Sequence, residues 1–275
     1  MAEKNENKLA KKEAAGALAL PGGYDYGNDA GSGWENTGTE DFTIPFLAVL
    51  QSNSPQIAET EAEYIEGAKA GMLMNTATQE LFDGKDGVEL VPCYTEHLFV
   101  EWRNRQTDGG GFIGIHTTDS DIVARAKAAS TQFGKYTVPV EGGVDHDLVE
   151  TFYIYGMIVA GDDIVGPCMV SFSSTKIKAY KGIMTPLRQV KGRPPLFAFK
   201  LKIVTVAEKN TKGSYYNFKI VPAGGSAVDS LIAPDHPFVL AGKEFKDQVA
   251  EGKAKIDHGG GNAGDGSGNE KNAPF

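Results

Sequence analysis

Residues 151–159 constrain the fold most, because this stretch is apolar at almost every position. Side chains of a β-strand point alternately to the two faces of its sheet, so a run that is apolar at consecutive positions is buried on both faces. We therefore expect residues 151–159 to form a central strand. The chain has 275 residues, which is enough for one large domain or two small ones around such a strand.

Further strands are expected at residues 88–102, 112–116 and 169–172. These stretches are rich in β-branched and aromatic residues and are bounded by Gly or Pro. The apolar run from Phe42 to Leu50 is expected to open the folded domain. Together the pattern predicts a β-rich α+β fold with short connections between strands.

Two stretches predict helices instead. Residues 119–133 begin with a capping Asp-Ser pair and place their apolar side chains on one face. Residues 175–190 follow hydroxyl residues at 173–175, any of which can cap the helix, and their apolar positions recur at spacings of three and four. Pro186 is expected to stop or kink this second helix near Met184, because proline lacks the N–H that the helix needs.

Residues 197–206 and 214–221 predict a β-hairpin. Alternation places Phe197, Phe199 and the inner residues of the second strand on one side, so we expect the phenylalanines in the core rather than as stacking platforms for bases. The other side is expected to be an open face made of five residues: Lys200, Lys202, Tyr215, Asn217 and Lys219.

Charge is distributed very unevenly along the chain. The net charge is −9, yet the segment from Lys176 to Lys219 holds eleven Lys or Arg and one acid, Glu208. This segment carries +10, which leaves −19 for the rest of the chain. The local field, rather than the net charge, attracts a polyanion. The alternative is an ordinary solvated basic face.

Single-stranded nucleic acid suits this segment, because cations neutralise phosphates and aromatic rings stack on exposed bases. A duplex reader more often shows a helix-turn-helix or zinc-finger pattern, and the sequence contains neither. The candidate binding residues of the segment are Lys176, Lys178, Lys181, Arg188, Lys191, Arg193, Lys200, Lys202, Tyr215 and Lys219.

A second candidate patch consists of Trp102, Arg103 and Arg105 at the end of the strand expected at 88–102. A Trp flanked by Arg can stack on a base and pair with a phosphate. The alternative is that Trp102 closes the core.

Enzyme motifs are weak. The G-x-G-x-x-G match at 259–264 lies in a polar tail without the strand and helix that a dinucleotide site needs. The acids at 145–147 and 162–163 could be imagined as nuclease metal ligands, but Asp is common in turns. Cys93 and Cys168 lie in apolar runs and are expected to be buried thiols. We therefore expect no catalytic residue, no metal and no cofactor.

Residues 1–40 are expected to be disordered, residues 41–250 to form the nucleic-acid-binding domain, and residues 251–275 to form a flexible Gly-rich tail. No apolar run approaches the roughly 20 residues of a membrane helix. The patch at 14–20 is too short and too Gly-interrupted for a signal peptide. We expect a cytoplasmic protein.

Three stretches carry a resemblance to a known family. They are Ile44-Pro45-Phe46-Leu47 with Gln51 and Pro55, then Ser173-Ser174-Thr175-Lys176, then Pro194-Pro195-Leu196-Phe197 leading to Gly213-Ser214-Tyr215-Tyr216. In these stretches the chain resembles phage-encoded single-stranded-DNA-binding proteins. The resemblance implies an OB-fold, a five-stranded antiparallel barrel, and a role in DNA replication or recombination in the host cytoplasm.

The resemblance also implies partner binding through the C-terminal tip. Such proteins commonly end in an acidic tail with a terminal aromatic residue that binds replication proteins, and Pro274-Phe275 is similar to such a tip. The tail departs from the pattern because it contains few acids. Two other functions stay open: a strand-annealing or recombination-mediator protein that assembles into rings or filaments of several copies, and a phage virion or host-inhibitory protein without nucleic-acid affinity.

Overall fold

The computed structural model describes residues 32, 33, 35, 43–104, 109–130, 134, 136–211 and 213–252. The predicted disordered ends fall almost wholly outside these residues, as do the tail residues Pro274 and Phe275 and the candidate binding residue Arg105.

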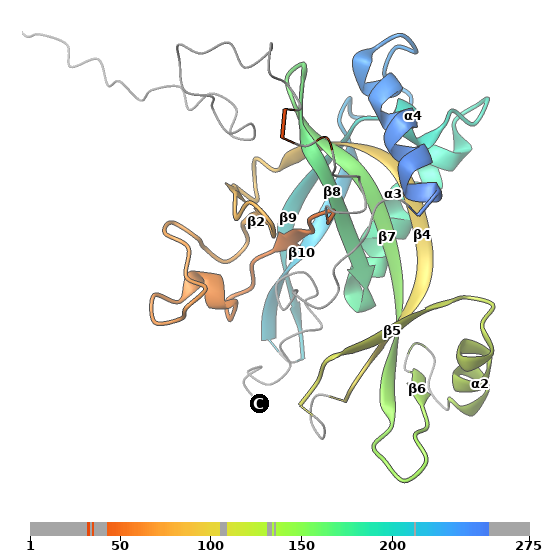
Figure 1. Cartoon of the computed structure of the whole chain (residues 1–275). Coiled ribbons are helices and arrows are strands. Elements are labelled where there is room, and N and C mark those ends of the chain that lie inside the picture. Colours follow the sequence, from red (N-terminus) through yellow and green to blue (C-terminus); the bar gives the residue numbers. More distant parts are fainter. Residues whose placement is uncertain are drawn as a thin grey trace, which may run out of the picture.

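A seven-stranded antiparallel sheet forms the body of the protein (Figure 1). Its strand order is β10-β9-β4-β7-β6, with β5 pairing β4 and β8 pairing β7. The strands are β4 (Val88–Trp102), β5 (Phe112–Thr117), β6 (Tyr136–Val138), β7 (His146–Ala160), β8 (Asp163–Ser173), β9 (Leu201–Asn210) and β10 (Gly213–Pro222). A small second sheet consists of β1 (Leu47–Val49), β2 (Leu73–Asn75) and β3 (Leu81–Phe82).

Three α-helices lie against the sheets in the described part of the chain. They are α2 (Asp121–Ala129), α3 (Ile177–Gln189) and α4 (Pro237–Ala250), and short 3-10 turns η3 (Pro55–Ile57), η4 (Ser174–Lys176) and η5 (Leu196–Ala198) accompany them. In the same residues no helix is long and apolar enough to cross a membrane.

Strand β7 is the central strand that the sequence predicted. Phe152 and Ile154 on one face pack into the largest core cluster, with α3. Tyr155 and Met157 on the other face belong to two clusters that also contain residues of α4. Burial on both faces explains why this stretch is apolar at consecutive positions.

Five strands in the order β10-β9-β4-β7-β8 follow one another in the sheet, but no pairing between β8 and β10 closes them into a barrel in the described residues. The β1 segment lies between these two strands instead. The Met169 amide of β8 donates to the Pro45 carbonyl (2.8 Å), and the Gln51 side chain bonds both the N–H and the C=O of Tyr216 in β10. The β-rich α+β class is therefore confirmed, without a closed barrel.

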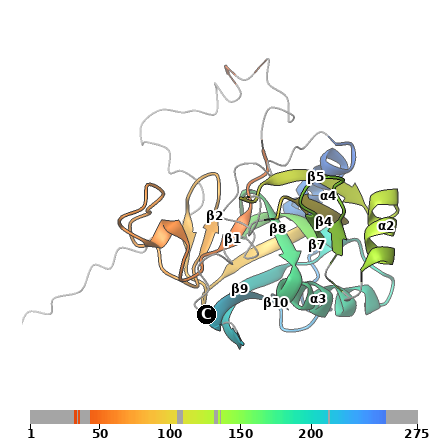
Figure 2. The same cartoon turned by 90° about the horizontal axis from the view of Figure 1, so that it is seen from below.

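Helix α3 runs through Pro186 to Gln189, which confirms the predicted range of 175–190, so of the two effects expected of Pro186 the stop near Met184 does not occur. Ile183 and Leu187 are both buried in the core, and this packing extends past the proline. Burial of apolar surface on the final turn offsets the single hydrogen bond that Pro186 removes. Figure 2 shows α3 beside β10.

The hairpin begins later than predicted. Residues 196–198 form η5, and β9 starts at Leu201, so Phe197 and Phe199 do not share a strand. Phe199 is buried in the largest cluster, whereas Phe197 packs beside Phe238 of α4 in another. The prediction that both phenylalanines serve the core is confirmed.

Candidate nucleic-acid interface

The face of the hairpin follows from the pairing of β9 with β10. Lys202 lies opposite Val221, Val204 opposite Lys219, and Glu208 opposite Tyr215. Residues opposite each other in an antiparallel pair share a face, so Lys202, Tyr215 and Lys219 lie on one side as predicted. Lys219 is exposed, and Lys202 is half-buried.

Two acids also lie on or beside this face. Glu89 of β4 pairs with Lys202 in the sheet, and its carboxylate accepts a hydrogen bond from the Lys200 ammonium at 2.9 Å. Lys200 therefore already has a partner. Both side chains are about one-third exposed, and an ion pair of this kind contributes at most about 1 kcal/mol, so a phosphate would compete with a weak bond.

Glu208 holds the aromatic ring of the hairpin face. The Tyr215 hydroxyl donates to its carboxylate at 2.6 Å, and the Asn217 amide donates to the same oxygen at 3.2 Å. These two hydrogen bonds, helped by the charge of Lys178, lower the pKa of Glu208. Asn217, opposite Val206, lies on the predicted face, but it is only 3% exposed, so the face is not open at this position. The same bond from Tyr215 raises the pKa of its hydroxyl.

Lys176 lies in η4 and is 6% exposed. Its ammonium sits 5.5 Å from the centroid of the Phe218 ring in β10, a cation–π contact. Lys176 therefore does not extend the exposed basic surface, contrary to the expectation from the sequence.

Five exposed cations of the segment between Lys176 and Lys219 lie on α3 and on the loop after it. Lys178, Lys181 and Arg188 lie on the helix side opposite the buried Ile183 and Leu187. Lys191 and Arg193 are exposed in the following loop. We call Lys178, Lys181, Arg188, Lys191 and Arg193 the basic ridge. Within the described residues none of these five side chains forms an ion pair.

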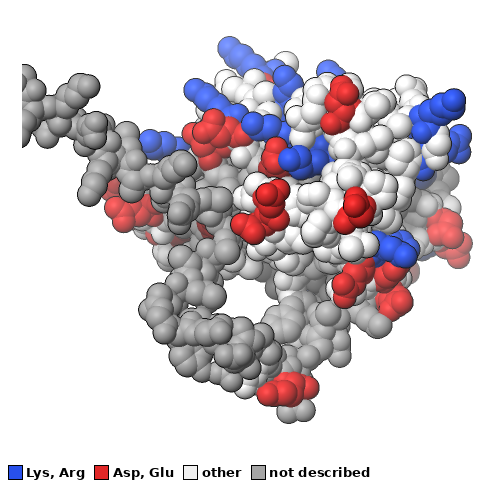
Figure 3. Space-filling model, turned by 90° about the horizontal axis from the view of Figure 1, so that it is seen from above, with Lys and Arg blue, Asp and Glu red and all other residues white. Residues whose placement is uncertain are grey.

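The face of the molecule drawn in Figure 3 carries both signs of charge. Figure 3 looks down on the end of the molecule that carries α4, and its Lys and Arg side chains lie mostly along the upper margin. Asp and Glu side chains lie nearer the centre and the lower margin of the same view. The single-signed stretch between Asp163 and Glu208 in the sequence is thus a local feature.

The structure does not bring the Trp102 patch together with the basic ridge. Trp102 is half-buried, packs beside Val100 and Tyr153, and meets Phe112 edge-on at 5.8 Å. Only Arg103 of this patch is exposed in the described residues. Because β9 pairs with the opposite end of β4, Trp102 lies away from the hairpin. Its packing beside Val100 and Tyr153 agrees with the alternative that Trp102 closes the core.

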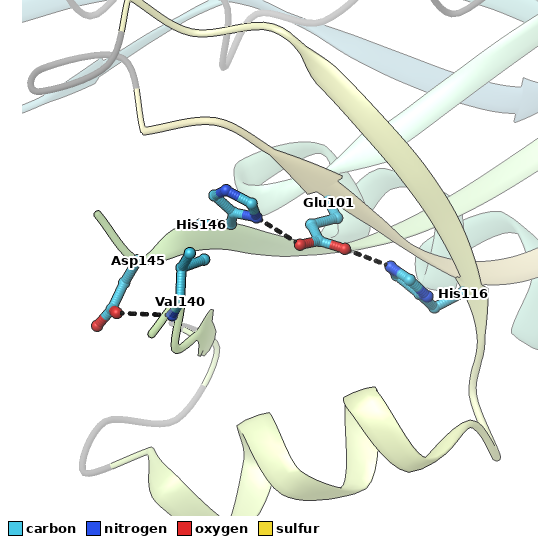
Figure 4. Close-up of polar contacts among 5 residues, drawn as sticks. All are labelled: Glu101, His116, Val140, Asp145 and His146. Carbon is cyan, nitrogen blue, oxygen red and sulfur yellow. Dashed lines mark hydrogen bonds and ion pairs between the residues drawn. The ribbon is translucent and has the colours of Figure 1, made fainter. Parts of the chain in front are cut away.

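A buried carboxylate with two histidines escaped the sequence analysis (Figure 4). Glu101 of β4 accepts from His116 of β5 at 2.7 Å and from His146 of β7 at 2.6 Å. The two imidazoles bond different oxygens of the carboxylate, so the three side chains tie neighbouring strands together and do not converge on one point. No group of three or more metal-binding side chains occurs in the described ranges. The sequence carried one signal for this cluster: side chains alternate between the two faces of a strand, and this alternation could have placed Glu101, His116 and His146 on one face of the sheet.

Both cysteines are buried, as predicted. Burial raises the pKa of the Cys93 thiol to about 12 and raises that of Cys168 as well. A reactive thiolate needs the opposite shift.

Comparison with known proteins gives one match. The family model described as Pam3 phage gp34-like protein matches residues 11–255. Searches of curated proteins and of solved structures found no match to the chain. The match covers most of the sequence and supports the phage part of the resemblance noted above. The chain belongs to the Pam3 phage gp34-like protein family.

Proposed function

We propose that this protein binds single-stranded DNA without strong sequence preference, through the basic ridge with Lys202 and Lys219 of the hairpin beside it. The observation that carries the proposal is the stretch between Asp163 and Glu208, which contains no acid. Its exposed cations lie on one helix side and one loop, and none of them has an ion-pair partner among the described residues.

The physical basis is counterion release. Each phosphate that a Lys or Arg neutralises frees condensed cations from the nucleic acid, which stabilises the complex. Contacts to phosphates position the strand and carry no base information, so binding of this kind tolerates any sequence. The ridge needs only to hold the strand, so no catalytic residue or cofactor is part of the proposal.

The fold supports an OB-like interpretation of the domain. Five consecutive antiparallel strands, β10-β9-β4-β7-β8, have their open edges bridged by the β1 segment. OB-folds, which are five-stranded and partly open barrels, bind single strands across the barrel surface. A role in covering DNA during phage replication or recombination follows from this interpretation and from the phage family.

One titration tests the proposal. Fluorescently labelled single-stranded and duplex DNA of equal length are titrated with the protein at 50 and 200 mM salt, with and without magnesium. We expect tighter binding to the single strand, weaker binding at the higher salt, and an intact probe.

Each other outcome points to a different function. An absence of binding at 50 mM salt would refute the proposal and favour a virion or host-inhibitory protein. Degradation of the probe with magnesium would indicate a nuclease. Rapid pairing of complementary strands, together with rings or filaments, would indicate an annealing protein.

A further inference from the structure

Three aromatic rings from three different elements form a stack beside the basic ridge. His97 of β4 lies against Phe152 of β7, with ring centroids 4.0 Å apart and planes 12° from parallel. Phe152 in turn lies against Tyr180 of α3, with centroids 4.7 Å apart and planes 28° from parallel. We call His97, Phe152 and Tyr180 the ring stack.

The ring stack is anchored at one end and exposed at the other. Phe152 is 8% exposed, and Tyr180 packs against the core cluster of α3. The side chain of His97, by contrast, is 38% exposed. Its Nε2 lies 2.9 Å from the carboxylate of Glu150, a contact that fixes the ring in its plane. His97 thus offers water a flat ring whose orientation is set by two neighbours.

Each of the two aromatic neighbours of His97, Phe152 and Phe99, has a lysine ammonium near its ring. The Lys181 ammonium of α3 lies 5.5 Å from the centroid of Phe152, directly beside the ring stack. The Lys127 ammonium of α2 lies 4.5 Å from the centroid of Phe99, whose ring is 5.8 Å from His97. Both lysines are exposed. Lys181 also belongs to the basic ridge, so the ridge and the ring stack are neighbours at this residue.

We propose that His97 is a stacking platform for an unpaired base of single-stranded DNA, with Lys181 and Lys127 contacting the phosphates on either side of that nucleotide. This inference rests on the proposed function and adds the element that the ridge lacks, an aromatic contact. Histidine is among the side chains on which unstacked bases lie in protein complexes. Bases within a duplex are already stacked on each other, so only a single strand can use the platform.

Stacking and phosphate contacts respond differently to salt. Removing a phosphate contact lowers the slope of log affinity against log salt concentration, because fewer counterions are released. Removing the protein ring on which a base stacks lowers the affinity and leaves that slope unchanged, because no phosphate contact is lost. This difference separates the platform from the ridge in one data set.

The test uses the full-length protein and an oligo(dT) strand that carries one photoreactive 5-iododeoxyuridine. We expect a crosslink to His97, located by mass spectrometry of the digested complex. We expect His97→Ala to weaken binding of oligo(dT) by about 5- to 150-fold, the loss for one stacked base, with an unchanged salt slope. His97→Phe, which keeps a ring, is expected to bind like the wild type.

Tyr64→Ala is the matched control, because Tyr64 is an exposed aromatic residue in the loop between η3 and β2. Wild-type affinity in His97→Ala, with crosslinks only outside the ring stack, would overturn this inference and leave the proposed function intact. A wild-type protein that fails to bind oligo(dT) at 50 mM salt would instead refute the proposed function. The crosslink decides the question if His97→Ala does not fold.

Discussion

The basic ridge yields a quantitative prediction about salt. In the variant Lys178→Gln, Lys181→Gln, Arg188→Gln, three exposed charges are removed from one side of α3 and none of the buried residues of the helix is touched. Each phosphate contact on a single strand contributes about 0.7 to the slope of log affinity against log salt, so loss of three contacts lowers the slope by about 2. Between 50 and 200 mM salt, that change corresponds to a factor of about 16 in relative affinity.

Fluorescence anisotropy of labelled oligo(dT) at four or five salt concentrations measures this slope. A second triple variant, Lys69→Gln, Lys85→Gln, Lys243→Gln, has the same net charge and also loses three exposed lysines, from two loops and α4. We expect this control to keep the wild-type slope within about 0.5. Circular dichroism and thermal melting confirm that both variants are folded.

Equal slopes in the two triple variants would refute the assignment of the ridge. That result would mean that net charge, rather than the position of the charges on α3, sets the affinity. A ridge variant with wild-type slope and wild-type affinity would exclude α3 from the interface altogether.

Four further predictions concern stability and reactivity. Gly156→Ala would place a Cβ 2.6 Å from the carbonyl oxygen of Val91 in the neighbouring strand, so we expect a loss of about 1–3 kcal/mol in the free energy of unfolding by urea. Glu101→Gln removes an acceptor from one of two histidines, and the same measurement should show a loss of about 1–3 kcal/mol. Burial raises the pKa of Cys93 from 9.0 to about 12, so its contribution to stability is complete below pH 9.0 and is lost as the pH rises towards 12. Neither Cys93 nor Cys168 should react with an aromatic disulfide at pH 8 until urea is added, and rapid labelling of the native protein would contradict their burial.

Local patterns predicted the strands well. The predicted strand at 88–102 has the bounds of β4, because β-branched and aromatic residues recur along its whole length between two turns. Pro92 lies inside this strand, where the pairing with β7 shifts register between Pro92 and Tyr94. A bulge of this kind tolerates a residue that cannot donate to the ladder.

Helix α4 was not predicted, although its start carries recognisable signals. Pro237 occupies the first turn, and the His236 ring accepts a hydrogen bond from the Phe238 amide as an N-terminal cap. Histidine is not a usual cap, so the segment did not stand out from the surrounding turn residues.

The hairpin shows how a small error in a turn changes a site. With the turn at 211–212, counting outward from it places Glu208 opposite Tyr215. The predicted hairpin ended its first strand at residue 206, so the acid was assigned to the loop. An error of a few residues therefore hid the hydrogen bond that occupies the hydroxyl of the only aromatic residue on that face.

Other parts of the site depend on tertiary contacts that no local pattern contains. Lys200 and Glu89 are 111 residues apart in the chain and meet only because β9 pairs with β4. Lys176 lies in a 3-10 turn before α3 and is buried against Phe218, a contact that its place in the basic segment did not reveal. The ring stack likewise joins two strands and a helix.

These contacts shift the expected centre of binding from the hairpin to α3. A cation that binds a phosphate gains the counterion-release free energy minus the cost of giving up any partner it already has. Lys200 must give up Glu89, and Tyr215 is engaged with Glu208, whereas the ridge cations form no ion pair with another described residue. The ridge therefore retains the full gain per phosphate, and His97 beside it supplies the ring that the hairpin face no longer offers. In the proposed function, the uneven charge that pointed to the segment between Lys176 and Lys219 is therefore expected to act mainly through α3 and the loop after it.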